Sequence, residues 1–164
     1  MGRRHEGREA AIQFLVYCDL NQGAAVSGAN ATDEAAFWAL RPAAPKKVRD
    51  FALELARGAL HCRVETDKRI SGYAQNYELH RLAAVDRNIL RLALYEMFYR
   101  DDIPPVVSIN EAIEIAKKYG TEESGRFVNG ILDRAKLDLD RPLRTARPAA
   151  EKIAPSAPTP SPAI

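Results

Sequence analysis

Residues 86–100 read DRNILRLALYEMFYR, and this segment decides the fold. It contains neither glycine nor proline, and its apolar side chains would cover most of the circumference of an α-helix. A helix that is apolar nearly all round must be surrounded by other elements, so we expect it to be central and the most buried. Asp86 can cap its first turn. Val85, before that cap, could then pack on Ile89 or Leu90 as a hydrophobic staple.

The segments before this helix have the same helical period. Their apolar residues recur at intervals of three, four and seven positions, which predicts amphipathic helices. The positions are Ala11, Phe14, Leu15 and Cys18, widened by Ile12 and Val16, and then Val48, Phe51, Ala52, Leu55 and Ala59, continuing through Val64 to Ile70. Residues 21–45 between them are irregular, with a short helix expected near 33–40 that Phe37 and Trp38 would anchor.

The end of the central helix is marked by Asp-Ile-Pro-Pro at 102–105. Proline lacks the backbone N–H and disfavours a helical conformation in the residue before it. Ser108 and Glu111 then have the spacing of a capping box, and Gly120 can close the helix that they begin. No run of residues has a convincing strand pattern, so the sequence predicts an all-α protein.

The last predicted helix contains EESGRFVNGILDRAK, residues 122–136, and Thr121 or Ser124 can cap it. Two of its residues, Asn129 and Gly130, lie among apolar neighbours. Glycine costs a helix about 1 kcal/mol relative to alanine, so we expect Gly130 to allow another helix to approach closely. Asn129 would satisfy buried backbone groups across that contact, or fix the turn before the helix.

The last 24 residues differ in composition from the rest. Six of the ten prolines lie there, mixed with Ala, Ser and Thr, and such a segment buries too little apolar surface to offset its ordering entropy. We therefore expect a helical domain at 1–140 and a disordered tail at 141–164. Residues 1–140 carry 20 Lys and Arg against 21 Asp and Glu, so a polyanion would have to bind at a local patch.

Several classes of protein are disfavoured. No apolar run approaches the ~20 residues needed to cross a bilayer, and no signal peptide is visible. The two cysteines lack CxxC spacing, which favours reduced thiols in the cytoplasm, and the three histidines are too dispersed to predict a metal site. No glycine-rich phosphate loop occurs, and capping accounts for Ser108 without a nucleophilic role. The sequence therefore predicts no enzyme, no cofactor and no metal.

Basic side chains gather at two places. Arg3, Arg4 and Arg8 lie at the N-terminus, and Lys117, Lys118 and Arg126 surround the 120–126 turn, where Tyr119 and Phe127 flank them. Basic groups hold phosphates, aromatic faces stack on unpaired bases, and the N–H groups of a helix start bind anions. This combination is typical of a protein that binds single-stranded RNA, although charged turns are more often merely solvated.

Four stretches resemble the NusB family of transcription antitermination factors, in the order and at the separations found in that family. They are Arg3-Arg4 followed by REAAIQ at 8–13, AAVDRNILRLALYEM at 83–97, DIPPVVSINEAIEIAKKYG at 102–120, and ESGRFVNGILDRA at 123–135. The resemblance spans about residues 3–137. It implies a compact fold of two small helical subdomains.

The resemblance also implies a function. Members of the family bind the boxA sequence of nascent RNA together with NusE, a small-subunit ribosomal protein. The complex joins RNA polymerase and suppresses premature termination, notably on ribosomal RNA operons. The match places these residues on the RNA side: Arg3, Arg4, Arg8, Lys117, Lys118, Glu123, Ser124, Arg126 and Phe127.

The chain also departs from the family pattern. His5, Glu6 and Gly7 dilute the usual arginine run, and Asn76-Tyr77 stands where members often have Asn-Trp. Two other functions stay open from the sequence. One is a non-catalytic helical adapter, and the other is an RNA-binding accessory domain related to those of ribosomal RNA cytosine methyltransferases.

Overall fold

The computed structural model describes residues 2–22 and 31–146, and its regular elements are all helices. Seven α-helices and one 3-10 turn follow in order: α1 (Arg3–Gln22), α2 (Ala31–Ala39), α3 (Lys46–His61), α4 (Arg63–Tyr73), η2 (Leu79–Arg81), α5 (Ala84–Tyr99), α6 (Pro105–Tyr119) and α7 (Glu122–Lys136). No strand occurs in this part of the chain. The predicted all-α class is confirmed.

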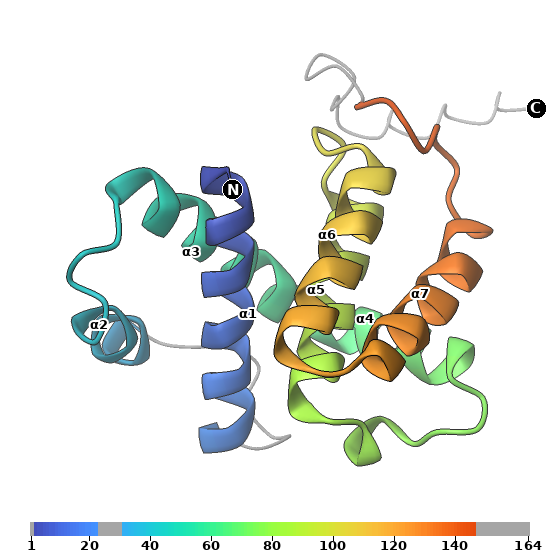
Figure 1. Cartoon of the computed structure of the whole chain (residues 1–164), viewed down its shortest axis with the longest axis horizontal. Coiled ribbons are helices and arrows are strands. Elements are labelled where there is room, and N and C mark those ends of the chain that lie inside the picture. The colour runs from blue at the N-terminus through green and yellow to red at the C-terminus, as the bar shows by residue number, and fades with distance from the viewer. Residues whose placement is uncertain (1, 23–30, 147–164) are drawn as a thin grey trace, which may run out of the picture.

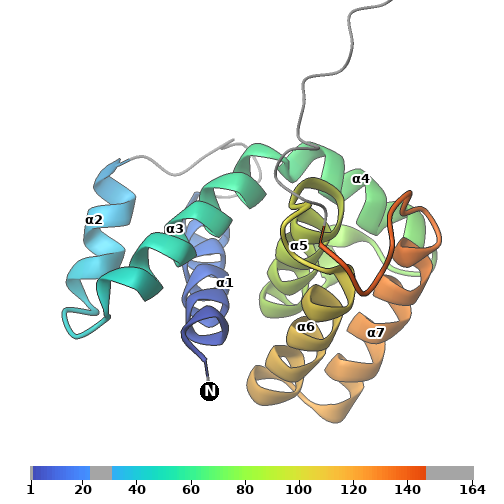
Figure 2. The ribbon, with the colours of Figure 1, turned by 90° about the horizontal axis from the view of Figure 1, so that it is seen from above.

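The helices form two groups on either side of a central helix. Figures 1 and 2 show α1, α2 and α3 in one group and α4, α6 and α7 in the other, with α5 between them. Helix α5 packs against α1, α3, α4, α6 and α7. Every residue from Asn88 to Met97 is buried, so the helix is enclosed on all sides as its composition predicts. The two helical subdomains are likewise confirmed.

The start of α5 differs from the prediction. The helix begins at Ala84, and Ala83 precedes it without a side-chain cap, so the proposed Asp86 cap and Val85 staple are wrong. Asp86 instead lies in the first turn, where its carboxylate accepts a 3.4 Å hydrogen bond from the Ser124 hydroxyl of α7. Burial raises the pKa of Asp86, and the bond from Ser124 opposes that rise. The Asp86 carboxylate, predicted to cap the helix, therefore forms a tertiary contact instead.

The start of α6 also corrects the sequence reading. Pro105 occupies the first turn, where its fixed φ suits a helix and its missing N–H leaves no donor unpaired. The helix thus begins three residues before Ser108, which is only 1% exposed. Glu111 bonds to His5 of α1 rather than to a helix end. The predicted capping box is wrong because proline had already started the helix.

The predicted apolar stripe from Val48 to Ile70 is divided between two helices. The chain changes direction at Cys62, between α3 and α4. Val64 consequently faces solvent, with 65% of its surface exposed, whereas Ile70 is fully buried. The prediction holds for the α3 stripe and for Ile70 and fails for Val64.

The N-terminal group is held by aromatic packing. Phe37 and Trp38 of α2 are buried, and the Phe37 ring meets that of Phe14 edge to face at 5.1 Å. Trp38 packs edge to face on Phe37 at the same distance. The short helix and its two anchors, predicted from residues 33–40, are confirmed. Residues 23–30 of the irregular stretch lie outside the described residues.

The predicted tail begins with a buried side chain. Arg141 is 7% exposed, and its guanidinium donates hydrogen bonds to backbone carbonyls at the end of α5 and in the loop after it. The accepting residues are Glu96, Met97, Arg100, Asp101 and Ile103. The Leu143 carbonyl also accepts from the N–H of Val106 at 2.9 Å. The folded unit therefore continues past residue 140, and residues 147–164 lie outside the described part.

The two unusual residues of α7 do not have the expected role. Asn129 and Gly130 are exposed, and a methyl group at Gly130 would meet nothing within 4 Å. Close helix approach is instead provided by Gly58 of α3, where a methyl group would overlap the Tyr95 ring of α5. The prediction of close packing at Gly130 is wrong, because α7 turns that residue outward.

A buried ionic cluster joins the two groups of helices. The Asp19 carboxylate of α1 accepts from Arg87 at 2.7 Å, from Asn88 at 2.9 Å and from Arg91 at 3.1 Å, all of α5. Arg91 also binds Asp67 of α4 through two hydrogen bonds of 2.7 and 3.1 Å. These bonds fix α1 and α4 against the central helix.

None of the helices in residues 2–22 and 31–146 is both long and apolar enough to cross a bilayer.

Candidate nucleic-acid interface

A tight turn joins α6 to α7. Thr121 accepts a 3.2 Å hydrogen bond from the Ser124 N–H, so Thr121 is the predicted cap of the last helix. At Gly120 a methyl group would lie 2.5 Å from the Ser124 hydroxyl and 2.9 Å from the Ala116 carbonyl oxygen. Only glycine leaves room for that approach, which holds the end of α6 against the start of α7.

The turn brings three exposed basic residues together. Lys117 and Lys118 end α6, and Arg126 lies one turn into α7; we call these three residues the basic corner. A methyl group at the buried Gly125 would lie 2.8 Å from Cγ of Lys117. The aliphatic stem of Lys117 therefore packs on α7 at Gly125.

Lys118 has an internal partner. Its ammonium donates to both carboxylate oxygens of Glu9 in α1, at 2.9 and 3.0 Å, and this bond raises the pKa of Lys118. The Tyr119 hydroxyl donates to the same carboxylate at 3.0 Å and accepts from the Gln13 amide at 2.9 Å. Burial alone would raise the pKa of Glu9, but bonds from Lys118, Tyr119 and His5 hold it below its ordinary value.

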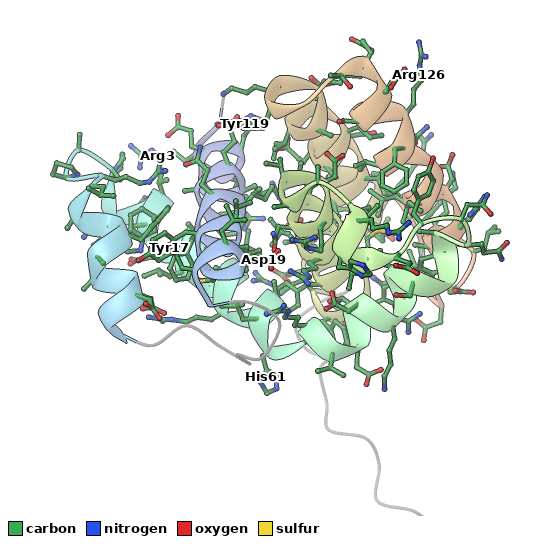
Figure 3. All side chains as sticks on the ribbon, turned by 90° about the horizontal axis from the view of Figure 1, so that it is seen from below. Arg3, Tyr17, Asp19, His61, Tyr119 and Arg126 are labelled. Carbon is green, nitrogen blue, oxygen red and sulfur yellow. The ribbon has the colours of Figure 1, made fainter. Side chains whose placement is uncertain are left out.

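The N-terminal arginines are divided. Arg3 and Arg4 are exposed in the first turn of α1, and the Arg4 guanidinium lies over the Phe51 ring at 5.1 Å. Figure 3 shows Arg3, Tyr119 and Arg126 along one edge of the molecule, in that order. Arg3 therefore lies on the same side as the basic corner, at the other end of that edge.

Arg8 does not belong to that surface. It is 3% exposed, and its guanidinium donates a 2.9 Å hydrogen bond to the buried Glu96 of α5. Burial raises the pKa of Glu96, and the charge of Arg8 opposes the rise. Position 8 follows position 4 by one helical turn on the face of α1 that meets α3 and α5, so the inclusion of Arg8 in the RNA surface is wrong.

An aromatic pair lies beside the basic corner. Phe127 is half-buried, and its ring meets the Tyr77 ring edge to face at 5.5 Å. The pair separates two hollows, one of about 170 Å³ near Arg126 and Arg134, and one of about 330 Å³ near Thr121 and Glu123. Tyr77 is 59% exposed, so its ring is available for stacking.

Two further predicted site residues lie on the rim of the larger hollow. Glu123 is exposed, and Ser124 is half-buried with its hydroxyl bonded to Asp86. Six of the predicted site residues therefore lie around one turn: Lys117, Lys118, Glu123, Ser124, Arg126 and Phe127. Arg3 and Arg4 lie at a distance from this turn, in the first helix, and Arg8 is not part of the exposed surface. Sequence reasoning missed Tyr77 and Glu9. The departure at Asn76-Tyr77 from the family pattern was the signal that could have identified Tyr77.

The part of the chain that the structure describes holds two cysteines and no group of metal-ligating side chains. Within residues 2–22 and 31–146, no three His, Cys, Asp or Glu side chains come together as metal ligands would. Cys18 and Cys62 are free thiols, and burial raises the pKa of Cys18 to about 11, which keeps it protonated.

The fold and the surface define an all-helical protein of two subdomains, with exposed basic and aromatic side chains around the turn between its last two helices. A family model described as the NusB family matches residues 5–136. The chain belongs to the NusB family.

Relatives and solved structures agree with this assignment. Transcription antitermination protein NusB of Geobacter sulfurreducens is 47% identical over 81% of this chain and 93% of its own length. The Myxococcus xanthus protein of the same name is 42% identical over 87% of this chain and 100% of its own length.

Two solved structures resemble the fold. NusB of T. maritima aligns with a TM-score of 0.71 and 38% identity, over 86% of this chain and 94% of its own. The crystal structure of the antitermination factors NusB and NusE in complex with dsRNA aligns with a TM-score of 0.70 and 25% identity. That alignment covers 82% of this chain and 96% of the other.

Proposed function

We propose that this protein is a transcription antitermination factor of the cytoplasm that binds boxA RNA of nascent transcripts, notably of ribosomal RNA operons, together with NusE. The complex would join RNA polymerase and suppress premature termination. Membership of the NusB family over residues 5–136 supports the class of function. Its relatives carry the name of transcription antitermination proteins, and one similar structure contains NusB, NusE and dsRNA.

The observation that carries the RNA-binding part is the basic corner beside an exposed aromatic pair. Lys117, Lys118 and Arg126 would hold successive phosphates, and Tyr77 with Phe127 would present ring surface to unpaired bases. Glu123, on the rim of the same hollow, would repel phosphate and favour a base edge that carries hydrogen-bond donors. Arg3, which lies on the same side of the molecule, would extend the contact, and so would the exposed Arg4 next to it in the chain.

The proposed binding needs a preformed surface. The Thr121 cap and the approach at Gly120 fix the turn, and α5 supports α6 and α7 from beneath. A rigid surface loses little conformational entropy on binding, so most of the electrostatic attraction of the basic corner contributes to affinity. No step of this function requires a catalytic group.

The test is a titration of boxA RNA against a scrambled strand, with and without NusE, using wild-type protein and the double variant Lys118→Glu/Arg126→Glu. We expect wild-type affinity to prefer boxA, to rise with NusE, and to fall with salt. Loss of two phosphate contacts should reduce the salt slope by about 1.4, at ~0.7 for each phosphate on a single strand.

The matched control is Lys68→Glu/Lys136→Glu, which makes the same charge change at two exposed lysines held by i,i+3 pairs on α4 and at the end of α7. The control should bind as wild type does. If wild-type protein shows no preference for boxA even with NusE, the proposal is wrong and a helical adapter becomes the better description. If the control loses as much affinity as the double variant, binding follows net charge rather than the basic corner.

A further inference from the structure

A histidine lies between two carboxylates where α1 meets α6. Nδ1 of His5 lies 2.5 Å from an oxygen of Glu111, and its Nε2 lies 2.8 Å from an oxygen of Glu9. The histidine side chain is 10% exposed, and that of Glu9 is 14% exposed. Glu9 is the residue that also holds Lys118 of the basic corner.

The His5 ring fixes the position of Glu9. Its two nitrogens face the carboxylates of Glu9 and Glu111, which come from different helices, so Glu9 is held where α1 and α6 meet.

Two further groups of α6 reach the same carboxylate. The ammonium of Lys118 lies 2.9 Å from an oxygen of Glu9, and the hydroxyl of Tyr119 lies 3.0 Å from the other oxygen.

We propose that Glu9 competes with RNA phosphate for Lys118, and that His5 positions Glu9 for this competition. This inference rests on the proposed RNA-binding function of the basic corner. Lys118 keeps 56% of its side-chain surface exposed while it is bonded to Glu9, so a phosphate can reach its ammonium from solvent. Each Lys118–phosphate contact then replaces a Lys118–Glu9 contact.

The exchange leaves Glu9 with two donors, Tyr119 and His5. These contacts keep the Glu9 carboxylate beside the basic corner, where it can bind Lys118 again when the RNA leaves. Glu9 therefore lowers the affinity of the basic corner for RNA, and His5 sets the position of Glu9.

The first experiment compares Glu9→Gln with Glu6→Gln in the full chain, using boxA RNA as the probe. Glu6 is exposed on the same helix, so both variants change net charge equally. We expect Glu9→Gln to bind about twofold to fivefold more tightly than Glu6→Gln, the range that separates an exposed ion pair from its neutral counterpart. The gain should disappear when both variants are made in a Lys118→Gln background, because the competition needs both partners.

The second experiment compares the boxA affinities of His5→Asn and His80→Asn with that of wild type. His80 is exposed with 77% of its side-chain surface, so it is the matched control. We expect His5→Asn to bind boxA more tightly than His80→Asn, because a Glu9 that His5 no longer positions holds Lys118 less well. This difference should disappear in a Lys118→Gln background. Thermal melting of each variant verifies that it is folded at the temperature used.

The outcomes separate the two proposals. If wild-type protein does not prefer boxA, the proposed function is wrong. If wild type prefers boxA but Glu9→Gln binds no more tightly than Glu6→Gln, or gains equally without Lys118, the competition is wrong. Should Glu9→Gln fail to fold, the comparison of His5→Asn with His80→Asn decides, because a merely structural His5 would give no difference in affinity that depends on Lys118.

Discussion

The contact between α1 and α5 and the turn between α6 and α7 both depend on basic side chains, but they surround them differently. In the first, Arg91 is buried, Arg87 is half-buried, and both share the carboxylate of Asp19. In the second, Lys117 and Arg126 are exposed, and within the described residues neither forms an ion pair with a carboxylate. Basic side chains thus hold helices together in the first region and face solvent in the second.

The difference follows from the free-energy cost of placing a charge at each position. A charge removed from water must be compensated by partners with good geometry, so buried arginines are fixed by several bonds each. An exposed charge keeps its hydration and contributes little to stability. Residues of the first kind should therefore control folding, and residues of the second kind should control binding, with little overlap between the two effects.

The largest expected effect is at the centre of the buried cluster. Asp19→Ala leaves Arg87 and Arg91 without their shared carboxylate, and breaking a buried pair in this way costs about 3–5 kcal/mol of unfolding free energy. Chemical denaturation measures the loss. The control, Asp133→Ala, removes a half-exposed partner of Lys136 and should change stability by less than about 0.5 kcal/mol. Equal effects of the two variants would remove the distinction between the regions.

The same carboxylate predicts a pH dependence. Burial alone would raise the pKa of Asp19, but hydrogen bonds from Arg87 and Asn88 and the charge of Arg91 hold it below its ordinary value. A lowered pKa in the folded state gives stability that is present above the unfolded value of about 3.9 and is lost as the pH falls through the folded value. Asp19→Ala should therefore lose less stability than wild type between pH 5 and pH 2.

The next largest effect is at Arg141, which tests whether the chain after residue 140 belongs to the folded unit. Arg141→Ala removes a buried guanidinium that binds carbonyls at the end of α5, and bonds of this charged kind are each worth about 1.5–3 kcal/mol. We expect a net loss of about 2 kcal/mol. Arg144→Ala, at an exposed position three residues later, should leave the denaturation midpoint unchanged. If neither variant loses stability, the folded unit ends at residue 140, as the sequence predicted.

The helices could be predicted from sequence because their apolar periodicity is local and repeated. The central position of α5 followed from a run without glycine, proline or a polar face, and the Thr121 cap followed from a short-range pattern. Two of the failures have a common cause. Asp86 and Arg141 form contacts with residues distant in the chain, and no local pattern specifies such partners.

The candidate site was predicted only where its residues are neighbours in the chain. Lys117, Lys118 and Arg126 surround one turn, so the sequence alone brought them together. Glu9 and Tyr77 reach the same region from α1 and from the segment before η2, which only the tertiary fold can show. Arg8 was misassigned for the opposite reason, because a cluster of charges in sequence says nothing about which helix face each charge occupies.

The smallest expected effect distinguishes the two faces of α7. Gly130→Ala adds a methyl group in open space at an exposed helix position, so it should stabilise the protein by about 0.5–1 kcal/mol and raise the melting temperature by about 1–4 °C. Gly125→Ala adds the same group 2.8 Å from Cγ of Lys117 and must displace that side chain, which offsets the gain in helix propensity. Thermal melts followed by circular dichroism compare the two variants directly. If Gly130→Ala melts no higher than Gly125→Ala, the outward orientation of Gly130 is wrong, and the close helix contact expected from the sequence must be reconsidered.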